Sequence, residues 1–237
     1  VAAGWPDVVL AALAGGTNNA FAPPADPLVV GLAAGLFAGD PDGFGAHARS
    51  VPRLDVAIDG RVPPSALVDV AVVDEPWIGA HALWDADLLV EAVLARADPT
   101  VSGLAGVGGA VHPILAGGLH VRFGRGGTPT IAPLGPGQME AVPIAEWSEL
   151  RPGDEVVVAG GRRVALAFDG EREIVLQPDQ RARVRLVAHG PRVLDARGVV
   201  WQAARQGAFR QPRGRGRRHD SDNSDNTDNE RRRDADQ

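Results

Sequence analysis

The apolar run at residues 8–13 and the segment AGGTNNAF at residues 14–21 constrain the fold more than any other part of the sequence. The run carries no charge and lacks helical spacing, which predicts a buried strand. Two prolines at positions 23 and 24 then delay a helix, which is expected over residues 25–38. A strand, a glycine turn and a helix in this order predict an α/β sheet whose ligands bind at the carboxyl ends of the strands.

The glycine turn is itself a candidate ligand site. Gly16 would let a ligand approach the backbone closely, while Thr17, Asn18 and Asn19 offer donors and acceptors without charge. The alternative is an ordinary turn in which the two asparagines only tolerate a left-handed backbone. A short glycine motif alone does not separate these two interpretations.

Composition narrows the class of protein. The 237 residues are 44% hydrophobic, enough for one large or two ordinary cores, and the absence of cysteine excludes disulfides and thiolate metal sites. No signal peptide is recognisable, and no apolar stretch reaches the roughly 18 residues that a membrane span requires. We therefore expect a cytoplasmic protein that does not enter a membrane.

The segment 209–237 differs in kind from the rest of the chain. After Phe209 it has no large apolar residue, and from residue 210 onward eight arginines face seven acidic residues. Such a segment cannot bury enough apolar surface to fold, so we expect a disordered tail. Its arginines could contact nucleic acid, but the Asp-Ser-Asp-Asn repeat that follows opposes this, and nucleic-acid binding is disfavoured.

The middle of the chain has the pattern of a β-rich domain. Residues 54–58 alternate, Asp59-Gly60 is a hairpin signal, and residues 66–73 form a second expected strand. One amphipathic helix is expected over residues 85–97. Further strands, separated by glycine turns, are expected at 119–123, 130–134, 155–158, 164–168, 173–176 and 183–187. The predicted class is α+β: a partial α/β (Rossmann-like) domain at 1–50, then a mainly β, sandwich-like domain at 51–208.

A second glycine-rich stretch, VSGLAGVGGAVHP at residues 101–113, is expected to be a loop with His112 beside it. His112 could reach a phosphate or a ribose, although a lone histidine is more often structural. Asp69, Asp74 and Glu75 could bind Mg²⁺ or accept ribose hydroxyls, although carboxylates at strand ends are usually solvated. The histidines lack ligand spacing and no Gly-x-Ser-x-Gly occurs, so a transition-metal site and a hydrolase are disfavoured.

Four motifs in this order resemble the NAD kinase family, and most of all its divergent branch that includes acetoin-catabolism protein X. They are GTNNAF at 16–21, GLAGVGG at 103–109, APLGPGQM at 132–139 and Asp-Gly-Glu at 169–171. The resemblance covers roughly residues 5–208. It departs in two places: no Gly-Gly-Asp-Gly-Thr phosphate loop is present, and Val68-Asp69 stands where the family has an Asn-Glu pair.

The resemblance implies an NAD site between an α/β domain and a β-rich domain with the sandwich-like fold of the NAD kinase C-terminal domain. It implies phosphorylation of NAD at the adenosine 2′-hydroxyl, with ATP or polyphosphate as donor and Mg²⁺ on the donor phosphates. The residues it places at the site are Gly16, Thr17, Asn18, Asn19, Phe21, Asp69, Gly103, Gly106, Gly108, Gly109 and His112.

The missing phosphate loop puts catalysis by these residues in question, because phosphoryl transfer depends on positioning and charge stabilisation of the phosphates. Two alternatives therefore stay open: a nucleotide-binding protein without catalysis, and a lipid kinase of the same superfamily. The absence of a basic amphipathic segment argues against the lipid kinase. A homo-oligomer is also left open.

Overall fold

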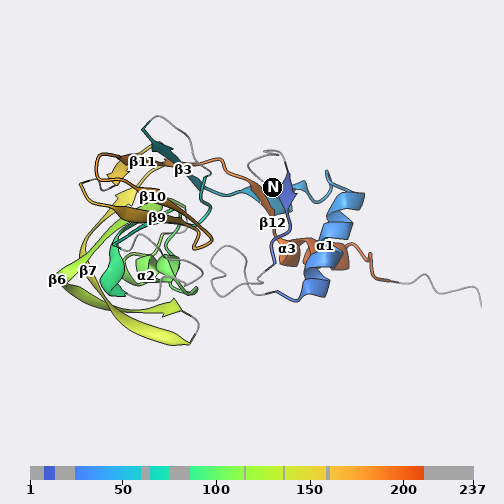
Figure 1. Ribbon diagram of the computed structural model, residues 1–237. Helices are drawn as coiled ribbons and strands as arrows, with labels where there is room; N and C mark the ends of the chain where they lie inside the picture. The colour runs from blue at the N-terminus through green and yellow to red at the C-terminus, as the bar shows by residue number, and fades with distance from the viewer. Residues whose placement is uncertain are drawn as a thin grey trace, which may run out of the picture.

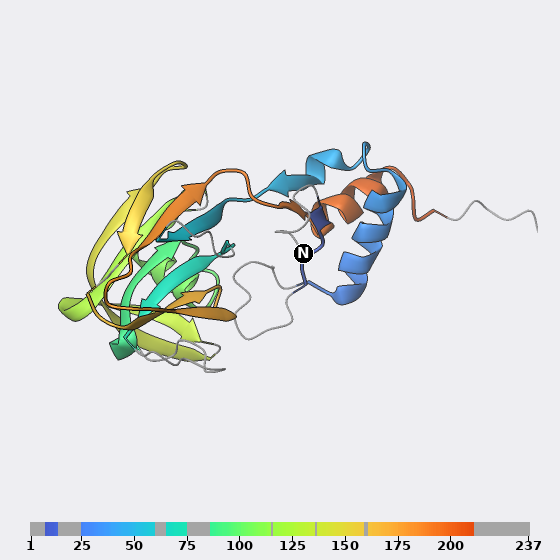
Figure 2. The ribbon, with the colours of Figure 1, turned by 45° about the horizontal axis from the view of Figure 1, so that its top comes forward.

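The computed structural model describes residues 8–13, 25–59, 65–74, 86–114, 116–135, 137–158 and 161–210. Most of its strands gather in one large part, and two helices, α1 (Pro27–Gly39) and α3 (Ala196–Arg205), lie together in a smaller part (Figures 1 and 2). This arrangement confirms the predicted α+β class and its sandwich-like β domain. No helix among the described residues is long and apolar enough to cross a membrane.

The smaller part is built from both ends of the described chain. Strand β1 (Val9–Leu10) runs parallel to β12 (Arg192–Leu194), which pairs antiparallel with β2 (Ala48–Ser50), and a short 3₁₀ helix η1 (Gly45–His47) precedes β2. The helices α1 and α3 pack on this sheet around a buried cluster of Ala33, Phe44, Ala48, Leu194, Val199 and Ala203. Of the buried strand predicted over residues 8–13, only the two-residue, partly buried β1 is present, and Leu13 is 52% exposed. Residues 192–205, which the sequence placed with the β-rich domain, pack here because their apolar side chains complete this small core.

Helix α1 confirms the predicted helix and begins where its sequence allows. The Asp26 carboxylate accepts a hydrogen bond of 2.8 Å from the Leu28 N–H, and Pro27 occupies the first turn, where no donor is needed. The helix has no polar side chain, yet only Val30 and Ala33 are buried, and Leu28 is 79% exposed. An apolar helix of this kind is usually covered on all sides.

The two glycines in the middle of α1, Gly31 and Gly35, make no close contact that would require glycine. A Cβ added at Gly31 or Gly35 would have no atom within 4 Å. Both residues therefore weaken the helix without making a contact that only glycine allows.

Replacing Gly35 with alanine is expected to raise the free energy of unfolding by about 1 kcal/mol, because alanine has the higher helix propensity and meets no atom here. For a chain of this size the melting temperature should rise by about 2–4 °C, measurable by calorimetry. Gly31→Ala should behave alike. A loss of stability in both variants would instead show that another surface packs closely against this side of α1.

The larger part consists of two antiparallel sheets. The six-stranded sheet has the order β10-β9-β4-β5-β6-β7, and the three-stranded sheet the order β3-β11-β8. Their bounds are β3 Arg53–Ile58, β4 Asp69–Val73, β5 Leu89–Leu94, β6 Gly118–Gly135, β7 Gln138–Leu150, β8 Glu155–Val158, β9 Val164–Phe168, β10 Arg172–Leu176 and β11 Ala182–Val187. One core fills the space between the sheets, and a second lies between the six-stranded sheet and helix α2 (Leu104–Val111).

The helix predicted over residues 85–97 is wrong. The segment forms a 3₁₀ turn, η2 (Ala86–Leu88), and then β5, which lies inside the six-stranded sheet between β4 and β6. A strand with cores on both faces is apolar throughout, and such a run also satisfies the helical spacing of apolar residues.

Two other predicted connections are wrong. The strands at 54–58 and 66–73 do not form one hairpin, because β3 and β4 belong to different sheets. An isolated antiparallel bridge joins Leu54 of β3 to Ala66, which precedes β4. The expected glycine turn at 124–127 does not separate two strands, because β6 continues through it with a change of register against β7. The predicted strands at 155–158, 164–168, 173–176 and 183–187 are confirmed.

Candidate functional site

The predicted site residues divide into three groups. Gly16, Thr17, Asn18, Asn19 and Phe21 lie outside the described residues, as does the tail from residue 211. Asp69 begins β4, the four glycines at 103–109 belong to the segment of α2, and His112 ends that helix. The structure therefore tests whether Asp69, the glycine-rich segment at 103–109 and His112 lie together.

The carboxyl group of Asp69 lies in an environment that disfavours its ionised form. Its strand lies between β9 and β5 in the sheet, and the residue is only 8% exposed. Its Oδ1 atom is buried and has no hydrogen-bond partner in the described part of the chain. Burial, and then repulsion by Asp169, raise the pKa of Asp69 to about 7. A buried acceptor without a donor needs a ligand, a solvent molecule or a functional reason.

Asp169 lies beside Asp69 because β9 pairs with β4. Asp169 and Gly170 form the tight turn between β9 and β10, with left-handed φ values of 54° and 68°. The sequence reading missed what the Asp169 side chain does: its Oδ1 accepts hydrogen bonds from the N–H groups of Leu67, Val68 and Asp69, at 2.9, 2.7 and 3.3 Å. One carboxylate thus holds the backbone that leads into Asp69. No local pattern signals this contact, since it joins residues about a hundred positions apart.

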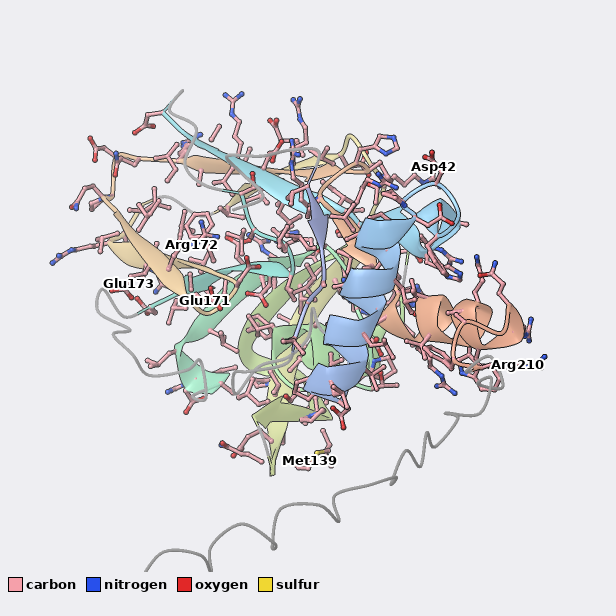
Figure 3. The ribbon with its side chains drawn as sticks, turned by 90° about the vertical axis from the view of Figure 1, so that its right-hand side faces the viewer. Asp42, Met139, Glu171, Arg172, Glu173 and Arg210 are labelled. Atoms are coloured by element: carbon pink, nitrogen blue, oxygen red, sulfur yellow. The ribbon has the colours of Figure 1, made fainter. Side chains whose placement is uncertain are left out.

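Arg172 supplies positive charge to Asp169. Its Nη2 atom lies 3.6 Å from Asp169 Oδ2 and donates to the Ser65 carbonyl at 2.9 Å, and its guanidinium lies over the Phe168 ring at 5.9 Å. Figure 3 labels Arg172, Glu171 and Glu173 close together at the edge strand β10. These donors surround Asp169, whereas no described donor reaches Asp69 Oδ1, and it is the pKa of Asp69 that is raised.

A second buried carboxylate in the same sheet shows the contrast. Glu91 on β5 lies 2.8 Å from the Nε2 atom of His120 and 3.9 Å from the Nε atom of Arg122, both on β6. This carboxylate has a hydrogen-bond partner in His120 and a nearby cation in Arg122, as expected of a buried acid. Asp69 departs from that pattern.

The glycine-rich stretch at 103–109 is not the predicted loop. Residues 104–111 form α2, and its glycines permit tight packing: a Cβ at Gly106 would overlap the Val101 carbonyl, one at Gly109 the backbone of Pro99, and one at Gly108 the Leu94 side chain. These glycines are explained by close contacts within the protein.

The start of α2 does lie near the acidic pair. Val68, the neighbour of Asp69, packs with Ala105 of the first helical turn in one small buried cluster. Gly103, the N-cap residue, has a left-handed φ of 86°, and its N–H donates to the Pro133 carbonyl at 2.8 Å. The structure thus brings the segment around Asp69 and the beginning of α2 together.

His112 lies at the other end of α2. An eight-residue helix is about 12 Å long, so His112 does not join Asp69. Its ring stacks on Trp147 with centroids 4.7 Å apart, and its Nε2 atom lies 2.7 Å from Glu149 Oε1. The partners of His112 are therefore Trp147 and Glu149, both on β7. A structural role for this histidine accounts for these contacts.

Comparisons with known proteins identify the family. The family described as the acetoin catabolism protein X C-terminal domain matches residues 52–189. The chain is also 35% identical over 213 residues to acetoin catabolism protein X of Cupriavidus necator. That match covers 86% of this chain, and the chain spans 59% of the length of the relative. The β sandwich that holds Asp69, Asp169 and α2 lies within the matched region, and the chain therefore belongs to the acetoin catabolism protein X family.

Proposed function

We propose that this chain binds NAD and serves in the transfer of a phosphoryl group from ATP or polyphosphate to the adenosine 2′-hydroxyl. Three motifs that resemble those of NAD kinases support the proposal: GTNNAF at 16–21, APLGPGQM at 132–139 and Asp-Gly-Glu at 169–171. The observation that carries it is Asp69, an acidic residue at the position where the resemblance requires a polar pair. It is buried and has no hydrogen-bond donor for Oδ1 among the described residues.

Asp69 is assigned to the ribose of the nucleotide. An ionised carboxylate accepts two hydrogen bonds, and the vicinal hydroxyls of a ribose supply two donors with matching separation. Such a ligand would provide the donors that Asp69 lacks. Asp169 and Arg172 act through Asp69: their bonds to the backbone at 65–69 fix the position from which its carboxylate meets the sugar. In the proposal Gly16, Thr17, Asn18, Asn19 and Phe21 line the remainder of the nucleotide site.

Magnesium enters the proposal only with the donor phosphates. Among the described residues, no three His, Cys, Asp or Glu side chains gather as a possible ion site. Mg²⁺ in phosphoryl-transfer sites usually keeps several waters and binds through one or two carboxylates together with the phosphates. The described residues do not form a dedicated magnesium site, so no step of the proposal depends on one.

Binding and catalysis are separable in this proposal. A nucleotide-binding protein without catalysis would use Asp69 in the same way, but would produce no NADP. A coupled assay for NADP, run beside a binding measurement, distinguishes the two functions.

Replacing Asp69 with asparagine is expected to weaken NAD binding at least about tenfold at pH 8, a loss of about 1.4 kcal/mol. The amide retains one acceptor but cannot accept from both hydroxyls, and its NH₂ group faces donors. Titration calorimetry measures the change. Asp74→Asn is the matched control, because Asp74 directly follows the same strand but is exposed and paired with Arg162 at 2.8 Å. Equal affinity in wild type and Asp69→Asn, or no NAD binding by folded wild type, would refute the assignment.

A further inference from the structure

A basic stretch without any acidic residue runs from helix α3 into the sequence that follows it. Residues 196–219 contain seven arginines and no aspartate or glutamate, although the whole chain has a net charge of −6. The stretch begins with α3 and passes Arg210, and beyond the described residues it continues as Arg-Gly-Arg-Gly-Arg-Arg at 213–218. Nucleic-acid binding is disfavoured when the tail is considered alone, but the chain joins the arginines of the tail to those of a folded helix.

Helix α3 presents two of these arginines on one face with an aromatic ring between them. Arg197, Trp201 and Arg205 follow one another at intervals of four residues, which places them on the same side of a helix. All three residues are exposed, Trp201 by 58%. Val199 and Ala203, by contrast, are buried in the core of the smaller part. The apolar side of α3 therefore holds the helix in place, and its arginine side is available to a partner.

The end of α3 adds a second ring and a third arginine. Gly207 has a left-handed φ of 80°, and the Ala208 N–H donates to the Ala203 carbonyl at 3.0 Å, which is the pattern of a Schellman cap. The Arg210 N–H donates to the Gly207 carbonyl at 3.0 Å. These bonds hold Phe209, which is 48% exposed, and Arg210 at the carboxyl end of the helix (Figure 3).

The arginines of this helix and its cap have no acidic partner in the part of the chain that the structure describes. Arg197, Arg205 and Arg210 take part in no ion pair there. The nearest acid in the sequence is Asp195, whose carboxylate accepts a hydrogen bond of 2.9 Å from the Gly198 N–H and caps the helix. The three guanidinium groups are therefore available to an anionic partner.

We propose that the exposed face of α3, together with the arginine-rich sequence after it, binds single-stranded nucleic acid. Guanidinium groups bind phosphates, and exposed aromatic rings stack on unpaired bases whatever their sequence. Arg197, Trp201 and Arg205 alternate these two groups along one helix, and Phe209 and Arg210 repeat them at its end. Arginine–glycine sequence such as that at 213–218 is also typical of segments that bind single strands.

The observations favour nucleic acid over two other anionic partners. A helix that binds a membrane surface needs a broad apolar face toward the lipid, whereas Trp201 is the one strongly exposed large apolar side chain of α3. An acidic protein would be attracted by the arginines, but it offers no planar bases on which both Trp201 and Phe209 could stack. Single-stranded nucleic acid provides both the phosphates and the rings.

Fluorescence anisotropy with labelled oligo(dT) or oligo(U) of about 20 nucleotides tests the proposal on the full chain. The affinity should fall between about 50 and 200 mM salt, because each phosphate contact adds about 0.7 to the slope of log K against log salt concentration. Trp201→Ala should weaken binding at least about fivefold, the lower limit for one stacked base. Arg197→Gln with Arg205→Gln should weaken binding and reduce the slope by about 1.4. All three side chains are exposed, so the variants should keep the wild-type melting temperature.

Two control variants match these changes elsewhere on the surface. Arg183→Gln with Arg185→Gln removes the same charge from β11, where both arginines are exposed and pair with Glu155 at 3.9 and 3.1 Å. Leu28→Ala removes an apolar side chain of α1 that is 79% exposed. Both controls should bind the oligonucleotide as the wild type does.

Polyglutamate of equal length and vesicles that contain anionic lipid separate the three kinds of partner. The oligonucleotide should bind at least about tenfold more tightly than polyglutamate, because only the oligonucleotide has bases to stack. A folded chain that does not bind it at about 50 mM salt overturns the proposal. Equal binding of polyglutamate, or tighter binding to the vesicles, does so as well. If the α3 variants bind like the wild type, binding belongs to the sequence after Arg210 alone and the assigned role of α3 is refuted.

Discussion

Replacing Asp69 with asparagine is expected to raise the free energy of unfolding at pH 8 by up to about 4 kcal/mol. The ordinary pKa of this carboxyl is 3.8, and in the folded chain it is raised to about 7. Each pKa unit corresponds to about 1.4 kcal/mol, and a shift of about three units therefore destabilises the folded state by about 4 kcal/mol once the group is ionised. Asparagine has nearly the same shape and carries no charge to bury.

The dependence on pH distinguishes this cause from a general change in packing. Well below pH 3.8 the carboxyl is protonated in both states, so the variant and the wild type should be about equally stable. Between pH 4 and pH 7 the unfolded chain releases the proton while the folded chain retains it, so wild-type stability falls as pH rises. Above pH 7 the difference is fully developed. Urea unfolding of both proteins across this range measures it, and a constant difference at all pH values would contradict the explanation.

This expected gain in stability bears on the proposed function. A buried carboxyl without a donor on Oδ1 destabilises the fold, and a ligand that supplies donors would remove part of that penalty. If Asp69→Asn stabilises the chain and also weakens NAD binding, the two results together assign Asp69 to a site where stability is lowered for binding. If it stabilises the chain and leaves binding unchanged, the nucleotide site lies elsewhere.

The parts of the fold that could be predicted are those governed by neighbouring residues. The β9–β10 hairpin follows from Asp169-Gly170, because both residues tolerate a left-handed backbone. The start of α1 follows from Asp26 and Pro27, which cap and open the helix. Strand β5 could not be recognised, because its burial on both faces comes from strands far away in the sequence.

The same limit applies to the candidate site: features that depend on residues distant in the sequence could not be predicted. Asp69 could be named from the sequence as an acidic residue at the start of a strand. Its raised pKa could not be, because it depends on burial in the middle of a sheet and on Asp169, a hundred positions later. The role of Asp169 could not be predicted either, because its hydrogen bonds reach residues about a hundred positions away. In the sequence, a turn alone was enough to explain this aspartate. The glycines of α2 show the opposite error: a composition typical of a ligand loop results here from close packing on Leu94, Pro99 and Val101.

The same substitution at two similar aspartates is expected to have opposite effects. Asp59 and Asp169 both have left-handed backbones, with φ values of 47° and 54°. Glycine relieves this strain, so Asp59→Gly should raise the free energy of unfolding by about 0.5–1 kcal/mol, as the Asp59 side chain has no hydrogen bond to another described residue. Asp169→Gly should instead lower it by about 3 kcal/mol, because three backbone N–H groups lose a charged acceptor.

Chemical unfolding at pH 8 measures both changes, and Asp169→Asn separates charge from geometry. The amide oxygen can still accept from the N–H groups of Val68 and Asp69, but it no longer attracts Arg172 or repels the carboxylate of Asp69. This variant should therefore lose less stability than Asp169→Gly, and the pKa of Asp69 should fall toward its ordinary value. If Asp169→Gly is as stable as Asp59→Gly, the three hydrogen bonds contribute nothing. Asp169 would then be a turn residue alone, as its place in the sequence first suggests.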